Sequence, residues 1–460
     1  MSAIAIIPGI VAIYWMSKYD YRKAYIDVYL FSLFLLPGWC RFPIPALPDP
    51  TFCESALLPI FAVFMIRFRG PWKWSFMDVA VFAYAAHIGI AEYHNAGFAE
   101  AQNLMFDMVA SGVLPYILAK GIIQKNNLTV PFVKKIIGML AFLVVTFVYE
   151  ARFGLNPYRQ IFDRFFPGQG DGWVTTFRYG LARTAGPYGH AILAGIVMMI
   201  GFSLALWMER SKLWEPRFKR WHFIKLSKAR ILTLAMVAGM VLTMVRGPQI
   251  GAVIAFAITI IGAGRDPAKR AWLVLAIALA IGIPAGISGY QYAAVGREHA
   301  KTTSQESAAY RKELIDKYEA IAMEHVWIGW GRNEWPKVSG MPSIDNYYLL
   351  LALMHGFTAS VILLTILIGS IVRLMRNGFR AAPLKPRGSS LSFCLAGAFA
   401  GFMFAILTVY MGDSIIPIFF TMVGFSDGYL QAGGDLQKKN LAATQGVVEA
   451  HQPRFATVLA

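Results

Sequence analysis

The sequence predicts an all-helical membrane protein with 12 or 13 transmembrane helices. Hydrophobic residues make up 57% of its 460 residues and charged residues only 15%, and the mean hydropathy is +0.51. This composition is typical of membrane proteins rather than soluble ones. Apolar segments recur up to about residue 430, and the basic residues gather in alternate loops. We therefore expect one integral membrane domain over residues 1–430 and a polar, disordered cytoplasmic tail over 431–460.

The expected spans follow from the length of the apolar segments, because about 20 apolar residues cross a bilayer. The first segment has no basic residues before it and no small-residue cleavage site, so we interpret it as a span rather than a signal peptide. Several segments are short or interrupted by Gly and Pro, which leaves the count at 12 or 13. The candidate segments are roughly 2–16, 25–40, 54–66, 76–92, 104–123, 132–149, 187–208, 229–245, 248–264, 271–289, 346–372, 390–410 and 413–430.

Lys and Arg residues alternate between successive loops, and this alternation predicts the topology. One set of loops, which includes 210–230 and the C-terminal tail, holds 29 of the 43 Lys and Arg residues, and the opposite set holds the other 14. The positive-inside rule places the richer set in the cytoplasm. The long segments 150–186 and 290–345 then face outward, as Arg246 does. The net charge of +17 therefore reflects topology, and we expect no nucleic-acid partner.

The outward segment 290–345 contains a predicted helix over about 305–324, which Ser304 can cap. Its inner face is predicted to carry Arg311, Leu314, Ile315, Tyr318 and Ala322. An arginine on a buried face needs an anionic partner. That partner is either an ordinary carboxylate or a bound ligand.

Arg246 is the only ionisable residue between Ile231 and Gly264, a stretch long enough for two spans. Arg246, Gly247 and Pro248 are expected to form the turn between these spans. An arginine at this depth either has a function or is a snorkelling side chain at a helix end.

Arg183, Arg246 and Arg311 are the three outward arginines that we expect to converge. Planar guanidinium groups bind diphosphates well, and three of them at the membrane surface could hold a lipid-linked diphosphate. They would stabilise the charge that develops on this leaving group during glycosyl transfer, without a metal.

The sequence contains none of the usual motifs of metal, nucleotide or serine-hydrolase sites. It lacks HExxH, GxSxG and CxxC, and the glycines at 168, 170 and 172 are not followed by Lys-Ser/Thr. We therefore expect no metal and no cofactor. Cys40 and Cys53 flank one short outward loop and could form a disulfide or remain unpaired.

Four stretches together resemble the O-antigen ligase and Wzy-type polymerase superfamily, over about residues 180–370. Met244-Val245-Arg246-Gly247-Pro248-Gln249-Ile250-Gly251 is similar to its S-R-G-x-x-x-G signature. The other three are Arg183…Gly186-Pro187…His190, Arg311 followed by Trp327-Ile328-Gly329-Trp330-Gly331, and Asp345-Asn346-Tyr347-Tyr348-Leu349.

The resemblance implies a GT-C-like O-antigen ligase/polymerase fold in the bacterial cytoplasmic (inner) membrane, with the active site facing the periplasm. It implies transfer of an undecaprenyl-diphosphate-linked glycan donor to a glycan acceptor, among membrane lipid. By this resemblance Arg246, Arg311 and Asp345 would be catalytic. The implied substrate contacts are Arg183, His190, Gln249, Trp330, Asn346 and Tyr347.

The sequence departs from the ligase pattern at Asp345, where that pattern has histidine. An Asp-Asn pair looks more like the exopolysaccharide or O-antigen polymerase branch than the branch that transfers glycan to lipid A core. Asp345 could accept the proton of the attacking hydroxyl or could simply cap the next helix. His190 could be a sugar or phosphate contact or could be structural.

A transporter of polysaccharide or lipid-linked glycan is the alternative from another functional class. Transporters carry acidic residues within spans, and here the candidates are Asp107, Glu150 and Asp413. No repeated halves with matching broken helices are visible, and a purely structural subunit would not need outward arginines. The outward aromatic residues could stack on sugars or belong to the interfacial belt; they are Trp327, Trp330, Trp335, Tyr347 and Tyr348.

Overall fold

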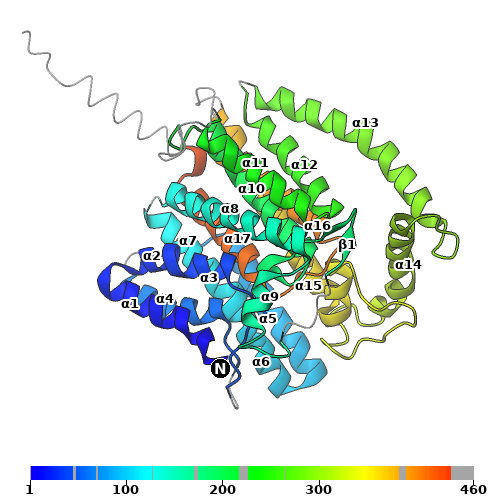
Figure 1. Cartoon of the computed structure of the whole chain (residues 1–460), viewed down its shortest axis with the longest axis horizontal. Coiled ribbons are helices and arrows are strands. Elements are labelled where there is room, and N and C mark those ends of the chain that lie inside the picture. The colour runs from blue at the N-terminus through cyan, green and yellow to red at the C-terminus, as the bar shows by residue number, and fades with distance from the viewer. Residues whose placement is uncertain are drawn as a thin grey trace, which may run out of the picture.

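The protein is a bundle of helices, seen here in a computed structural model (Figure 1). The structure describes residues 2–44, 48–68, 71–126, 128–169, 175–216, 226–264, 266–382 and 390–436. The α-helices are α1 (Ile7–Lys18), α2 (Tyr21–Ala24), α3 (Leu30–Leu35), α4 (Phe52–Arg67), α5 (Phe76–Ala96), α6 (Phe98–Met108), α7 (Leu114–Asn126), α8 (Thr129–Phe153), α9 (Pro157–Phe162), α10 (Ala191–Arg210), α11 (Lys228–Leu242), α12 (Arg246–Ile261), α13 (Pro267–Ala294), α14 (Thr303–Glu324), α15 (Tyr347–Ala381), α16 (Leu391–Ala405) and α17 (Ile416–Gln431). A short antiparallel hairpin pairs β1 (Phe177–Arg178) with β2 (Leu181–Ala182).

Each apolar segment predicted to span coincides with one helix or with a chain of consecutive helical turns. Five stretches are long and apolar enough to cross a membrane by themselves: Phe98–Ile123, Thr129–Phe153, Ala191–Arg210, Pro267–Ala294 and Tyr347–Ala381. Three shorter apolar helices are Ser2–Lys18, Arg246–Ile261 and Leu391–Ala405. The predicted class, an all-α polytopic membrane protein, is confirmed, and the number of crossings stays a prediction.

Helix α12 packs against α16 through glycines, and this contact fixes the position of Arg246 at the start of α12. A Cβ added to Gly401 would lie 2.5 Å from the carbonyl oxygen of Gly251, and one added to Gly397 would lie 2.5 Å from that of Ala255. Only glycine lets two helix backbones approach so closely. The last glycine of the R-G-x-x-x-G signature is therefore a packing residue.

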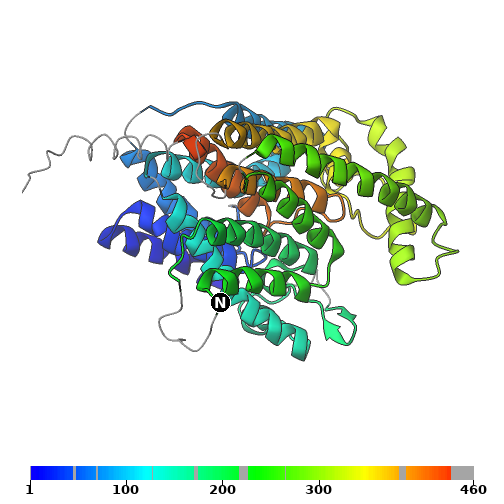
Figure 2. The same ribbon diagram turned by 90° about the horizontal axis from the view of Figure 1, so that it is seen from above.

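Helices α13 and α14 stand at one edge of the bundle (Figures 1 and 2). The most apolar part of α13 is not buried against the rest of the protein. Its side chains are apolar enough to face lipid instead. Helix α14 follows it and packs a buried face of Leu314, Tyr318 and Ala322 against residues that include Ile344 and Leu353. The amphipathic helix predicted from the sequence is therefore present, and its outward orientation stays a prediction.

Two details of the α14 prediction were wrong. The helix begins at Thr303 rather than Gln305, and its cap is Thr302, whose Oγ1 accepts the backbone N–H of Gln305 at 3.2 Å. Three successive hydroxyl residues could each cap here, and the one before the helix takes the role. Ile315, expected on the buried face, is 45% exposed.

Helix α15 is broken near its start, where Gly356 has φ 81° and ψ 164°. The segment after α14 lies across this break, because Trp330 N–H donates to Leu353 O (2.8 Å) and Phe357 N–H donates to Val326 O (2.8 Å). A Cβ on Gly329 would lie 2.5 Å from the carbonyl carbon of Met354. The glycines of the aromatic-glycine stretch thus allow two backbones to touch.

The side-chain contacts group the helix ends into two sets, as the charge alternation predicts. Arg41 pairs with Asp413 and Arg246 contacts Ser304, all on predicted outward segments. At the predicted cytoplasmic ends Lys120 pairs with Asp78, and Arg373 pairs with Asp427.

The prediction that the tail is disordered from residue 431 was wrong for its first residues. Helix α17 includes Gln431, and Gly434–Leu436 forms a 3₁₀ turn. The buried Asp435 side chain holds this turn by accepting the Tyr429 hydroxyl at 2.7 Å. Residues 437–460 lie outside the described residues. All three cysteines are described and are free thiols, so the disulfide alternative for Cys40 and Cys53 is wrong.

Candidate functional site

The turn between α11 and α12 consists of residues 243–245, so Arg246 does not lie in the turn as expected but is the first residue of α12. Pro248 explains the difference, because proline lacks an N–H and fits the first turn of a helix. Met244 has φ 53°, a conformation that is strained for a residue with a Cβ. The Nη1 of Arg178 donates to the Met244 carbonyl at 3.0 Å and holds this turn.

Arg246 is exposed, and its Nη2 donates to the hydroxyl of Ser304 at 3.1 Å. No ion pair joins Arg246 to a carboxylate within the described residues. A cation at a helix N-terminus faces the positive end of the helix dipole, and no side chain caps α12. This arrangement favours an anion at the site.

Arg311 lies on α14, seven residues after Ser304 and therefore on the same side of that helix. Seven residues correspond to about 10 Å along the axis, and the side chain of Arg311 leans back toward the helix N-terminus. Its Nε is buried without a hydrogen-bond partner. Arg311 makes no ion pair in the described part of the chain, so the carboxylate-partner alternative is not what the structure shows there.

The segment 150–186 carries Arg183 and is folded around a buried carboxylate. Glu150 accepts the backbone N–H groups of Ala185 (3.1 Å) and Gly186 (3.0 Å). Arg183 donates to Thr176 Oγ1 at 3.2 Å. Burial, and then the charge of Arg178, lower the pKa of Arg183 to about 10, so it remains a cation at neutral pH.

His190 is the N-cap of α10, because its Nδ1 accepts the N–H of Ile192 at 3.1 Å. Burial, and then the charge of Arg183, lower the pKa of His190 to about 4. The ring is therefore neutral at physiological pH. It packs edge-on against Tyr410, with ring centroids 6.4 Å apart.

The cap of α15 is Asn346 rather than Asp345, so the capping alternative for Asp345 was wrong. Asn346 Oδ1 accepts the N–H groups of Tyr348 (3.1 Å) and Leu349 (3.2 Å). Asp345 is partly exposed and accepts the Ser343 hydroxyl at 2.9 Å. Asp345 precedes Tyr347 by two residues, and the side chains of Tyr347 and Tyr410 line one cavity.

The remaining predicted contacts lie in different surroundings. Gln249 is half-buried in the first turn of α12. Trp330 is turned toward α14, where its indole N–H donates to Ile321 O at 3.0 Å. Tyr347 is buried, and its hydroxyl lies 3.4 Å from that of Tyr84.

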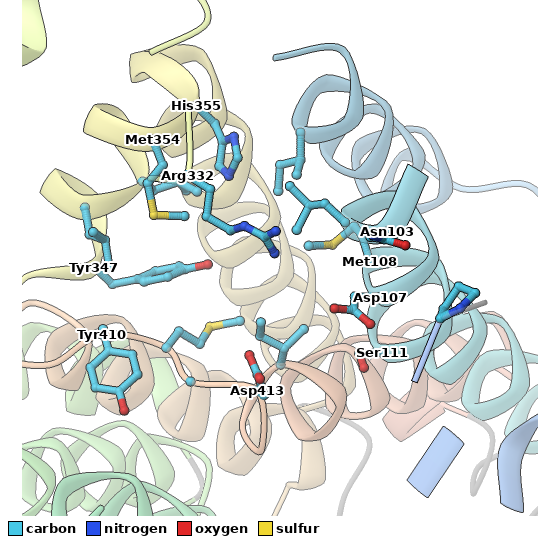
Figure 3. A pocket seen from close by; sticks show the side chains of 18 of the residues that line it. Asn103, Asp107, Met108, Ser111, Arg332, Tyr347, Met354, His355, Tyr410 and Asp413 are labelled. Carbon is cyan, nitrogen blue, oxygen red and sulfur yellow. The ribbon is translucent and has the colours of Figure 1, made fainter. Parts of the chain in front are cut away.

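Tyr347 and Tyr410 also line a cavity of about 590 Å³. Figure 3 shows the side chains of Arg332 and His355 on one side of it, facing Asp107 and Asp413 on the other. Arg183, Arg246 and Arg311 do not line it. Tyr410 lines the cavity and also packs against His190, which follows Arg183 by seven residues, and so links the cavity to the segment that carries Arg183.

Sequence reasoning missed Arg41 and Arg332 as site residues. Arg41 bridges Asp107 (3.1 Å) and Asp413 (3.2 Å). Arg332 reaches Glu100 at 3.0 Å and projects into the cavity (Figure 3). The only sequence signal was their place in basic-poor outward loops, which does not show what they face.

The carboxylates that suggested a transporter are engaged within the protein. Asp107 and Asp413 share Arg41, and Glu150 accepts backbone N–H groups. An acidic residue that binds and releases a coupling ion needs free coordination, and these contacts occupy it. The transporter alternative is weaker for this reason.

The part of the chain that contains Arg246, Arg311 and Asp345 matches a known protein family. Residues 231–369 match the family model for O-antigen ligase, Wzy_C. The match spans α11 to most of α15 and contains Arg246, Arg311 and Asp345, and it confirms the resemblance to the O-antigen ligase/Wzy-type family. No curated protein matches the chain. This match supports a polymerase- or ligase-type, glycosyl-transferring role in glycan assembly.

Proposed function

We propose that the protein is a glycosyltransferase that polymerises undecaprenyl-diphosphate-linked oligosaccharides on the outer face of the bacterial cytoplasmic membrane. The observation that carries the proposal is the pair Arg246 and Arg311. Arg246 contacts Ser304 of α14, Arg311 follows on the same side of that helix seven residues later, and neither arginine has a carboxylate partner among the described residues. Unpaired arginines beside a helix N-terminus suit a diphosphate.

In the proposed reaction, the bond between the donor's anomeric carbon and the diphosphate oxygen breaks. The electron pair leaves with undecaprenyl diphosphate, whose charge Arg246 and Arg311 stabilise. The oxygen of an acceptor hydroxyl forms the new bond to the anomeric carbon, and its proton passes to Asp345. Arg183 adds a third positive charge near the diphosphate, whereas His190 holds the start of α10 and Tyr410.

The Asp345-Asn346 pair favours polymerase over ligase, because the ligase pattern has histidine where Asp345 stands. Asn346 caps α15, so the carboxylate of the adjacent Asp345 is not used for capping. The Ser343 hydroxyl leaves the second carboxylate oxygen of Asp345 free for a substrate proton. Transfer to lipid A core is the second candidate within the same chemistry.

Reconstitution tests this function. The purified full-length protein in proteoliposomes should convert undecaprenyl-diphosphate-linked repeat units from the host into longer lipid-linked chains and release undecaprenyl diphosphate in equal amount. The variant Arg246→Ala should release it about 10²–10³-fold more slowly. If wild-type protein releases no undecaprenyl diphosphate with either repeat units or lipid A core as acceptor, the proposed transfer is wrong.

A further inference from the structure

The cavity lined by Tyr347 and Tyr410 differs in charge from the region that carries Arg183, Arg246 and Arg311. Its charged lining residues are Arg41, Arg332, Asp49, Asp107 and Asp413. Arg41 is held between two carboxylates, and Arg332 pairs with Glu100. Two cations therefore face three carboxylates in the lining, and the cavity offers no excess positive charge to a diphosphate.

The cavity also contains a polar group that has no hydrogen-bond partner among the described residues. His355 is only 2% exposed and lines the cavity, and its Nδ1 makes no hydrogen bond. Its ring points toward Arg332 in Figure 3. A buried nitrogen without a partner costs free energy unless a ligand or water satisfies it. The break of α15 at Gly356, one residue later, holds His355 in this position.

The remaining lining suits a sugar. Asn103 is exposed to the cavity, and Tyr347 contributes an aromatic ring (Figure 3). Sugar hydroxyls both donate and accept, and a lining that mixes guanidinium, carboxylate, amide and imidazole groups can satisfy both roles. A volume of about 590 Å³ is within the range of small-molecule sites.

We propose that this cavity binds the acceptor, as a neutral sugar end whose attacking hydroxyl lies beside Tyr410 and Asp345. The assignment rests on the proposed transfer function. In this assignment Arg246 and Arg311 hold the leaving diphosphate, and the cavity delivers the nucleophile. His355 and Asn103 bind hydroxyls of this sugar, and Arg332 bonds to a ring or hydroxyl oxygen.

Three variants change the cavity by different means. Met354→Trp fills it without removing a charge, because Met354 lines it and is partly buried. His355→Phe removes the unpartnered nitrogen at similar size. Asn103→Leu removes a polar group that makes no hydrogen bond within the described residues and so carries the least risk to folding. Met65→Trp is the matched control, because Met65 is 60% exposed on α4 and lies outside the cavity.

The test measures two ligands on the full-length protein in nanodiscs, with folding checked by thermal unfolding. The first is the neutral fraction of oligosaccharides released from the host's own polymer by partial acid hydrolysis, and the second is undecaprenyl diphosphate. We expect each cavity variant to weaken oligosaccharide binding about ten-fold or more, as loss of a buried hydrogen bond or of space implies. Undecaprenyl diphosphate binding should stay within two-fold, and Met65→Trp should match wild type for both ligands.

The contrary outcomes are distinct. Unchanged oligosaccharide binding in all three variants, no oligosaccharide binding by wild type, or tighter binding of the acidic oligosaccharide fraction would overturn the proposal. Equal loss of undecaprenyl diphosphate binding would assign the cavity to the donor instead. Failure of the proposed function looks different, because wild-type protein would then bind no undecaprenyl diphosphate whatever the cavity does.

Discussion

The two ends of the bundle use charged residues in opposite ways. At the predicted cytoplasmic end Lys120 is fully buried between Asp78 (2.5 Å) and Asp427 (2.9 Å), and Arg373 reaches Asp427 at 2.7 Å. Two cations there meet two carboxylates. At the predicted outward end, among the residues that the structure describes, Arg246 contacts only the Ser304 hydroxyl, and the Nε of Arg311 is buried without a hydrogen-bond partner.

This difference separates structural charges from functional ones. A buried, matched cluster joins helices and leaves no charge for a ligand. Unmatched arginines beside a helix N-terminus repel one another and the helix dipole unless an anion is bound. Evolution towards stability alone would pair them, so we interpret the unmatched end as the donor site. Variants at the two ends should accordingly fail in opposite ways.

The largest expected effect is at Asp345. Because Asn346 is the cap, Asp345→Asn should leave the fold intact and should still accept the Ser343 hydroxyl. Loss of the general base should lower the transfer rate about 10²–10⁴-fold. Asp345→His should keep part of the activity, since a neutral imidazole can accept the same proton. Initial rates in proteoliposomes measure this, and an Asn variant as active as wild type would remove Asp345 from the mechanism.

Removing one member of the matched cluster should instead affect stability. Lys120→Met leaves Asp78 and Asp427 close together in a buried site and should destabilise the protein by about 3–5 kcal/mol. Denaturation in mild detergent would show this as an earlier midpoint. The double variant Lys120→Met with Asp78→Asn should recover part of the loss. A single variant as stable as wild type would show that the cluster does not hold these helices together.

The unmatched arginines should behave in the opposite manner to Arg373, which serves as the matched control. Arg246→Ala and Arg311→Ala should each lower transfer about 10²–10³-fold, the usual cost of losing one group that stabilises transition-state charge. Their unfolding temperatures should not fall. Arg373→Ala should lower the unfolding temperature, because Asp427 loses one of its two cationic partners. Lysine should restore little at 246 or 311, since the planar fork is lost. Lower stability with normal specific activity for Arg246→Ala would make it a structural residue.

The smallest expected effect is at Ser304. Ser304→Ala removes one hydrogen bond to Arg246 and leaves the Thr302 cap of α14 in place. One such bond contributes about 1 kcal/mol, so transfer should fall about five-fold. Thr302→Ala, which shortens the start of α14 instead, separates positioning of Arg246 from folding of the helix. A Ser304→Ala rate equal to wild type would show that this contact does not position Arg246.

Much of the fold could be predicted because hydropathy and charge act locally along the chain. The helical segments, the two helices that meet at Arg246 and the amphipathic α14 all follow from residue spacing. Cap positions were predicted less well, since adjacent residues such as Asp345 and Asn346, or Thr302 and Ser304, have similar capping ability.

The site could be predicted only where a single residue stood out from its surroundings. Arg246 is conspicuous in an apolar stretch, whereas Arg41 and Arg332 are ordinary loop arginines until the fold brings them to one cavity. The cavity is built from segments as distant as residues 41 and 416. No local sequence pattern shows that such distant segments come together. The close backbone contact between the segments of Gly329 and Gly356 is equally non-local.

The most direct test of the account measures undecaprenyl diphosphate binding to the full-length protein in nanodiscs. Wild type should bind, with affinity that falls as salt rises. The double variant Arg246→Ala with Arg311→Ala should bind about 100-fold or more weakly, a loss of about 2.7 kcal/mol. Arg373→Ala, which changes the matched cluster, should bind like wild type once folded. A double variant that binds as tightly as wild type would contradict the claim that the unmatched arginines form the donor site.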